Sequence, residues 1–138
     1  MAERTDIMQD YSSLSPAELR AKFRTGALVL PTAGLCPGYI QGNLVILHRR
    51  YGEDFLQFMK QNPKPCPILE VFDQGSPISH KMAEGADITT DIPLYRIYRN
   101  GVFEEEVKDV SGYWNEDMVG FLIGCSLTFE SRLVEAGI

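Results

Sequence analysis

The dipeptide Asn100-Gly101 constrains the fold of this chain more than any other short stretch of its sequence. It separates two runs rich in aromatic and β-branched residues, 94–99 and 102–107. A two-residue type I′ turn requires positive φ at both central positions, which asparagine and glycine adopt more readily than other residues. The sequence therefore predicts an antiparallel β-hairpin over residues 94–107.

A helix is expected near the N-terminus. Ser15 is a typical N-cap, Pro16 suits the first helical position, and Glu18 completes a capping box. Gly26 is suited to end the helix, because glycine tolerates the left-handed conformation that follows a helix C-terminus. Farther along the chain, apolar runs predict buried strands at 43–47 and 68–72, and the residues at helical spacing predict an amphipathic helix at 51–61.

Two more helices are expected near the C-terminus. Asn115 or Asp117 can begin the first, which would run through Leu122. Ser126 can cap the second, which carries several apolar residues. The last helix would leave an apolar face uncovered, so self-association into a homo-oligomer is one expectation.

Length and charge exclude several classes of protein. A chain of 138 residues fits one domain. Its 13 basic and 19 acidic residues give a net charge of −6, and its isoelectric point is about 4.9. This acidity argues against a nucleic-acid binder and against an anionic membrane surface, although a few local groups can still bind a small anion.

The cysteines, the N-terminus and the hydropathy point to a cytoplasmic protein. The three cysteines form no CxxC pair, and only two histidines could add imidazole ligands, so no structural zinc site is expected. The acidic, polar N-terminus is not a signal peptide, and no apolar run approaches the roughly 20 residues of a membrane helix.

The irregular segment 31–43 is the first candidate for a binding site. Its two prolines and two glycines before Tyr39 exclude regular structure. The segment offers backbone amides together with the side chains of Thr32, Tyr39, Gln41 and Asn43, which could hold a carboxylate or an amide. The alternative is a rigid connection between two strands, and the residues alone do not separate these readings.

The segment 124–130 is the second candidate. Cys125 precedes the predicted start of a helix, where a thiolate is stabilised, and Ser126 with the first helical amides could instead bind an anion. Glu130 lies one turn after Ser126 and could act as a general base. The alternative for Cys125 is a small buried side chain without a chemical role.

Four segments together resemble a known family. They are PTAGLCPGYIQGNLVIL at 31–47, NPKPCPILE at 62–70, GADITTDIPLYRIYRNG at 85–101 and FLIGCSLTFE at 121–130. In this order they resemble the hydro-lyase family of YcsI-like proteins, which includes D-glutamate cyclase. The chain departs at Cys36, where alanine is expected, and at Leu127, where phenylalanine is expected. Family members also continue well past the position equivalent to Ile138.

The resemblance implies an α/β fold, a layered α/β sandwich with a smaller α+β portion at about 66–110 that contains the hairpin. Residues 1–138 would then be the N-terminal portion of the family pattern, without its C-terminal part. The implied activity is that of a lyase on a small amino acid or carboxylate, with D-glutamate and 5-oxo-D-proline interconverting with loss of water.

Such a cyclisation needs a positioned acid/base, donors for an oxyanion and an anchor for a carboxylate. We assign Glu130 as the acid/base and the amides around Cys125 and Ser126 as the charge-stabilising donors. The substrate would be held by Thr32, Tyr39, Gln41 and Asn43. No step calls for a metal or an organic cofactor.

Two alternatives remain open on the sequence. The chain could be a non-catalytic fragment that binds a small molecule, or a cysteine-dependent amidase or hydrolase acting on a lactam. In the second case Cys125 would be a covalent nucleophile, which is less favoured because direct attack by the substrate amine needs no acyl-enzyme.

Overall fold

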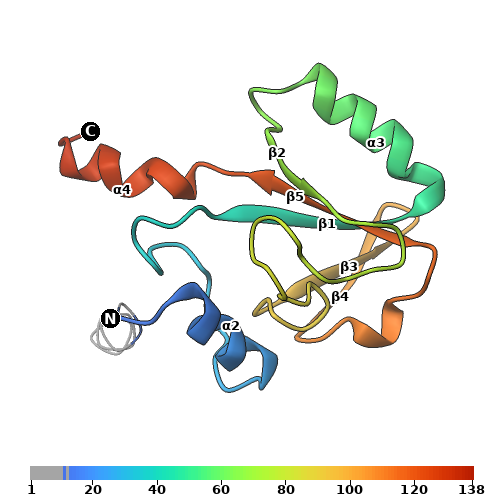
Figure 1. Cartoon of the computed structure of the whole chain (residues 1–138), viewed down its shortest axis with the longest axis horizontal. Helices are drawn as coiled ribbons and strands as arrows, with labels where there is room; N and C mark the ends of the chain where they lie inside the picture. The colour runs from blue at the N-terminus through green and yellow to red at the C-terminus, as the bar shows by residue number, and fades with distance from the viewer. Residues whose placement is uncertain (1–10, 12) are drawn as a thin grey trace.

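The computed structural model describes Tyr11 and residues 13–138 (Figure 1). Its helices and strands are, in chain order, α2 (Pro16–Arg24), β1 (Gly42–His48), α3 (Arg49–Gln61), β2 (Ile68–Val71), β3 (Tyr95–Arg99), β4 (Val102–Val107), the 3-10 helix η1 (Ser111–Tyr113), β5 (Met118–Gly124) and α4 (Leu127–Glu135). This mixture of helices and antiparallel sheets confirms the α/β class. No helix in this part of the chain is long and apolar enough to cross a membrane.

A three-stranded antiparallel sheet forms the centre of the molecule, in the order β1-β5-β2. One face packs against α3, where Met59, Val119 and Phe121 are buried together. Figure 1 shows α3 on one side of this sheet and both α2 and the β3–β4 hairpin on the other. The strands expected at 43–47 and 68–72 and the helix expected at 51–61 are confirmed, with small shifts at their ends.

The helix expected from Asn115 or Asp117 through Leu122 is wrong. Residues Met118–Gly124 form β5, the middle strand, which is hydrogen-bonded to a neighbour on each side. The residues of β5, MVGFLIG, are apolar or glycine on both faces of the sheet, so they lack the alternation that would separate a strand from a short helix. This strand is also closely packed at Gly120, where a Cβ would lie 2.5 Å from Cδ1 of Ile88.

The predicted hairpin is confirmed at 94–107. Asn100 and Gly101 have φ of 50° and 77°, as the type I′ turn requires. The hairpin forms a sheet of its own, and a salt bridge of 3.0 Å joins Arg96 on β3 to Glu106 on β4. Its register shifts once, between Ile97 and Tyr98.

The two terminal helices also follow the sequence. In α2 the capping box of Ser15 and Glu18 is present, and Gly26 follows the C-cap with φ of 70°. Ser126 stands at the N-cap position of α4 but makes no capping hydrogen bond. Figure 1 shows α4 extending from the end of β5, away from α3 and from the hairpin.

Candidate functional site

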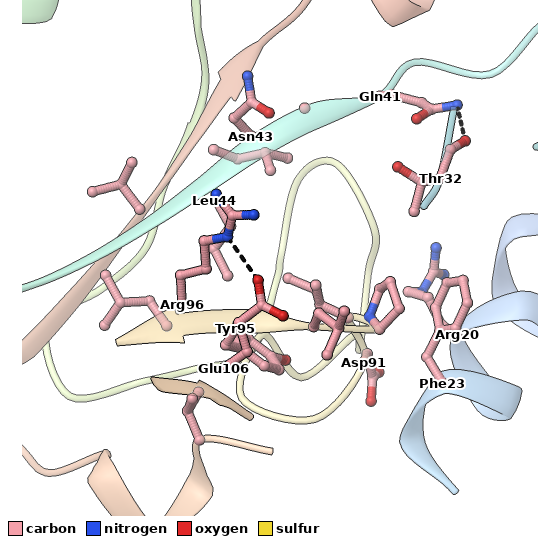
Figure 2. Close-up of a pocket in the computed structure, with 18 of the residues that line it drawn as sticks. Arg20, Phe23, Thr32, Gln41, Asn43, Leu44, Asp91, Tyr95, Arg96 and Glu106 are labelled. Atoms are coloured by element: carbon pink, nitrogen blue, oxygen red, sulfur yellow. Dashed lines mark hydrogen bonds and ion pairs between the residues drawn. The ribbon is translucent and has the colours of Figure 1, made fainter. Parts of the chain in front are cut away.

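A large open cleft lies between the sheet and the hairpin, on the side of the sheet opposite α3. Its volume is about 1280 Å³, and α2, β1, β3 and the segment 91–94 contribute to its walls. We call it the sheet–hairpin cleft. All four residues predicted to hold a substrate line it, namely Thr32, Tyr39, Gln41 and Asn43. Figure 2 shows Leu44 directed towards the hairpin and Asn43 on the opposite side of β1, so the carboxamide of Asn43 points away from the hairpin side of the cleft.

Gln41 is the best fixed of these residues. Its Nε2 donates hydrogen bonds to the carbonyl oxygens of Thr32 (3.0 Å) and Leu35 (3.1 Å) (Figure 2). Only the amide nitrogen can donate to two carbonyls, so the orientation of the carboxamide is determined. Its Oε1 is buried and has no hydrogen-bond partner among the described residues. The two hydrogen bonds of the amide nitrogen hold the loop between Thr32 and Gln41 together.

The backbone of Gln41 connects the cleft to the start of α4. The hydroxyl of Thr128 accepts from the amide of Gln41 at 3.1 Å and lies 3.2 Å from its carbonyl oxygen, to which it can also donate. The thiol of Cys125 lies 3.6 Å from the same carbonyl. These contacts follow from the sheet, because Gly42 is paired with Gly124 at the matching ends of β1 and β5.

The residues predicted to be catalytic lie beside the cleft rather than in its wall. Cys125 is half-buried, whereas Ser126 and Glu130 are exposed at the N-terminal turn of α4. The hydroxyl of Ser126 donates a hydrogen bond of 2.7 Å to Oε1 of Glu130. The two candidate segments are therefore neighbours through Gln41, but their side chains do not line one common pocket.

Sequence reasoning missed Thr128, which joins the two candidate segments. The polar residues between Cys125 and Glu130 drew attention to this turn. The neighbouring sequence does not indicate that Thr128 pairs with Gln41, which lies 87 positions away in the chain. Arg20 was also missed. Arg20 lies on α2 and lines the cleft (Figure 2). In the sequence, its position directly after the apolar Leu19, which is buried, was the signal that could have identified it.

Asp91 fixes the position of α2 at the cleft. Its carboxylate accepts two hydrogen bonds of 2.7 Å from Arg24, and its side chain is almost fully buried. Burial raises the pKa of Asp91, but the hydrogen bonds from Arg24, Thr90 and the Asp87 amide outweigh it, so the pKa lies below its ordinary value. Asp91 is thus a buried anion already satisfied by its partners, and its role here is structural.

Tyr95 contributes a neutral wall to the cleft. Its hydroxyl donates to the carbonyl oxygen of Ile88 at 2.8 Å, and burial raises its pKa. The phenol therefore stays protonated at neutral pH and is not available as a base.

Glu70 is a second buried carboxylate, on β2 and outside this cleft. It accepts from the hydroxyl of Ser79 and from the amides of His80, Lys81 and Met82, at 2.8–3.2 Å. Burial raises the pKa of Glu70, but these four hydrogen bonds together lower it by more, so the pKa lies below its ordinary value. We call this arrangement the Glu70 cage.

Residues 11 and 13–138 contain no group of three or more histidine, cysteine, aspartate or glutamate side chains placed to hold a metal ion. The polar groups available at the cleft and beside it include amides, hydroxyls, thiols, carboxylates, guanidinium groups and the imidazole of His48. Chemistry built from these groups is proton transfer, hydrogen bonding and binding of carboxylates.

No protein-family model matches the chain. Among curated proteins it is 54% identical over 129 residues to a protein of Thermoanaerobacter sp. (strain X514) named "Putative hydro-lyase", covering 94% of this chain and 49% of that protein. A protein of the same name from Stutzerimonas stutzeri is 53% identical over 128 residues, covering 93% and 48%. The "Putative hydro-lyase YcsI" of Bacillus subtilis is 50% identical over 125 residues, covering 91% and 49%. The chain spans about half the length of these relatives and matches their N-terminal half.

Proposed function

Because this chain corresponds to the N-terminal half of the hydro-lyase family that includes YcsI, we propose that it forms part of a hydro-lyase acting on a small amino acid. The proposed reaction interconverts D-glutamate and 5-oxo-D-proline. The observation that best supports a site here is the hydrogen bonding of Gln41, which lines the cleft and also contacts Cys125 and Thr128. A substrate at the Gln41 end of the cleft would lie beside the first turn of α4.

The reaction sets clear demands on these groups. The α-nitrogen of glutamate attacks the γ-carboxyl carbon, a C–N bond forms, and one C–O bond of that carboxyl breaks. The ammonium nitrogen loses two protons in total, and both leave with the carboxyl oxygen as water. We assign the proton transfers to Glu130, whose carboxylate can take a proton from nitrogen and return one to the departing oxygen. The hydrogen bond from Ser126 would hold this carboxylate in place.

The first turn of α4 offers donors for the negative charge that develops on oxygen. The amides of Ser126 and Leu127 precede that of Thr128, which donates to the carbonyl of Cys125 at 3.4 Å. The first amides of a helix lack partners within the helix and suit an anion. At the cleft, the guanidinium of Arg20 is suited to the α-carboxylate of the substrate, and Gln41 and Thr32 would contact the rest of it.

Binding without turnover is the second candidate function. Ser126 and Glu130 are exposed and do not line the cleft, whereas the four predicted binding residues do. A half of the family pattern could in that case bind an amino acid or lactam and leave the chemistry incomplete. This candidate predicts the same ligands but no conversion of one into the other.

NMR of D-glutamate and 5-oxo-D-proline tests both candidates. Two proteins should be compared, this chain and an extended form in which the chain is followed by the C-terminal half of the Thermoanaerobacter relative. We expect interconversion by the extended form. Conversion by neither protein, nor by the complete relative, would refute the cyclase assignment. Ligand-dependent shifts at Gln41 without conversion would favour the binding function.

Substitutions in the active form then test the assigned roles. Glu130→Gln should lower the rate about 10²–10⁴-fold, the usual contribution of a general acid or base. Glu135→Gln is the matched control, because Glu135 lies on the same helix and is exposed. Cys125→Ala should leave most activity, since no acyl-enzyme is proposed. Full activity of Glu130→Gln would show that the acid/base lies elsewhere, and loss of activity in Cys125→Ala would favour the cysteine-dependent hydrolase.

A further inference from the structure

The helix α4 carries large apolar side chains that the rest of the described chain does not cover. Phe129 and Leu133 lie one turn apart on the same face and are 53% and 39% exposed. Val134 is 73% exposed and projects from a different side of the helix. A helix with apolar residues on more than one side is typical of a buried position, not of one at the surface.

The attachment of α4 to the rest of the molecule is slight. Among the described residues, the hydrogen bonds that join this helix to another segment are those between Thr128 and Gln41. A helix of nine residues is too short to be stable in water by its own propensity and depends on packing. Next to Gln41, Tyr39 and Ile40 are also more than half exposed. We call Tyr39, Ile40, Phe129, Leu133 and Val134 the α4 surface.

The comparison with relatives indicates what would cover the α4 surface. The matched region includes 94% of this chain but only 49% of the Thermoanaerobacter relative, where it lies in the N-terminal half. Such relatives therefore carry about as many further residues after the region that corresponds to α4. Segments consecutive in sequence are usually adjacent in space, so these residues begin next to α4. A second copy of this chain is less suited, because each copy carries a net charge of −6.

We propose that α4 is the docking element for the C-terminal half of this hydro-lyase family, which packs on the α4 surface. The apolar side chains of Phe129 and Leu133 form the centre of that contact, and Tyr39 and Ile40 extend it onto the loop before β1. This inference rests on the match to the longer relatives and on exposed apolar area. It does not depend on the proposed cyclase reaction.

Hydrogen exchange of the α4 amides tests the proposal in this chain and in the extended form. In the chain alone, these amides should exchange nearly as fast as those of an unfolded peptide. In the extended form, their exchange should be slowed at least 100-fold, because packing of the apolar face holds the helix. Equal exchange in the two proteins would overturn the proposal, whatever the result of the activity assay.

A pair of aspartate substitutions makes the test specific to the surface. Phe129→Asp with Leu133→Asp should change little in the chain alone but should remove the slow exchange of α4 in the extended form, since a charge is costly in an apolar contact. Val102→Asp is the control, because Val102 is 65% exposed on the hairpin and lies outside the α4 surface. If slow exchange persists in the Asp pair, the docking surface lies elsewhere. If the chain alone forms a dimer that the Asp pair dissociates, a second copy is the occupant and the proposal is wrong.

Discussion

Replacing Glu70 with glutamine tests whether the Glu70 cage stabilises the fold. One carboxylate oxygen accepts from the amides of His80 and Lys81, and the other accepts from the hydroxyl of Ser79 and the amide of Met82. Glutamine keeps one acceptor oxygen and places an NH2 group at the other position. One or two of the four hydrogen bonds are then lost, because the backbone amides of His80, Lys81 and Met82 can only donate, whereas the Ser79 hydroxyl can turn and accept from the NH2 group.

The expected cost follows from this count. A hydrogen bond to a charged group contributes about 1.5–3 kcal/mol, so the loss of one or two bonds gives a decrease of about 1.5–6 kcal/mol in the free energy of unfolding. This is a large part of the about 5–15 kcal/mol that stabilises a typical domain. Urea denaturation at pH 7 measures the change. Glu84→Gln is the matched control, because Glu84 lies in the same loop and is exposed.

The pH dependence of the same variant supplies a second check. The folded-state pKa of Glu70 lies below its ordinary value of 4.5, so the carboxylate stabilises the fold above that value. This stabilisation is lost as the pH falls below 4.5 and through the folded-state pKa. The difference in stability between the native chain and Glu70→Gln should be constant from pH 7 to about pH 6 and should shrink towards pH 4 and below. A difference under about 0.5 kcal/mol at pH 7, or one that does not shrink in acid, would refute the reasoning.

Three further substitutions have effects that the structure sets, each measured by urea denaturation. Gly120→Val would place side-chain carbon against Ile88 and should destabilise the chain by about 1–3 kcal/mol or more, so an unchanged midpoint would mean that the two can move apart. Arg24→Gln removes the cation from the buried Asp91 and should cost about 2 kcal/mol, below the usual cost for a fully buried pair because Arg24 is half exposed; a change under about 0.5 kcal/mol would show that Thr90 and backbone amides suffice. Gly101→Ala forces a side chain into φ of 77° and should cost about 1 kcal/mol, and a gain in stability would contradict the type I′ turn.

The parts of the fold that the sequence predicts are those with local causes. The hairpin depends on the dihedral preferences of Asn100 and Gly101, and the start of α2 depends on Ser15 and Glu18, three positions apart. The strand β5 has no such local cause. Its residues are extended because β1 and β2 pair with it from both sides. The paired residues lie at least 50 positions apart in the chain, as in the pairing of Val71 with Phe121 and of Leu47 with Val119. Helical spacing of apolar residues was therefore a misleading guide to residues 118–124.

The candidate site divides in the same way. Composition alone draws attention to the segments 31–43 and 124–130, because the first is rich in prolines and glycines and the second combines small and polar residues at the expected start of a helix. The contact of Gln41 with Thr128 depends on the register of β1 and β5, which no local pattern specifies. The catalytic assignments of Glu130 and Cys125 are predictions that the proposed substitutions test, and those of Ser126 and of the four binding residues remain predictions.

The pairing of β1 with β5 that joins the two segments ends in a pair of glycines. Gly42 is paired with Gly124, and a Cβ at Gly42 would lie 2.9 Å from the carbonyl oxygen of Ile123. A Cβ at Gly124 would lie 2.9 Å from Cγ of Pro67. A larger residue at Gly42 would push β1 away from β5 at the point where Gln41 reaches Thr128 and Cys125, and one at Gly124 would push the end of β5 away from Pro67. Because Gln41 holds the loop 31–41 through its own side chain, the same displacement would also open the cleft wall. The two glycines thus couple the shape of the cleft to the position of α4, although neither carries a functional group.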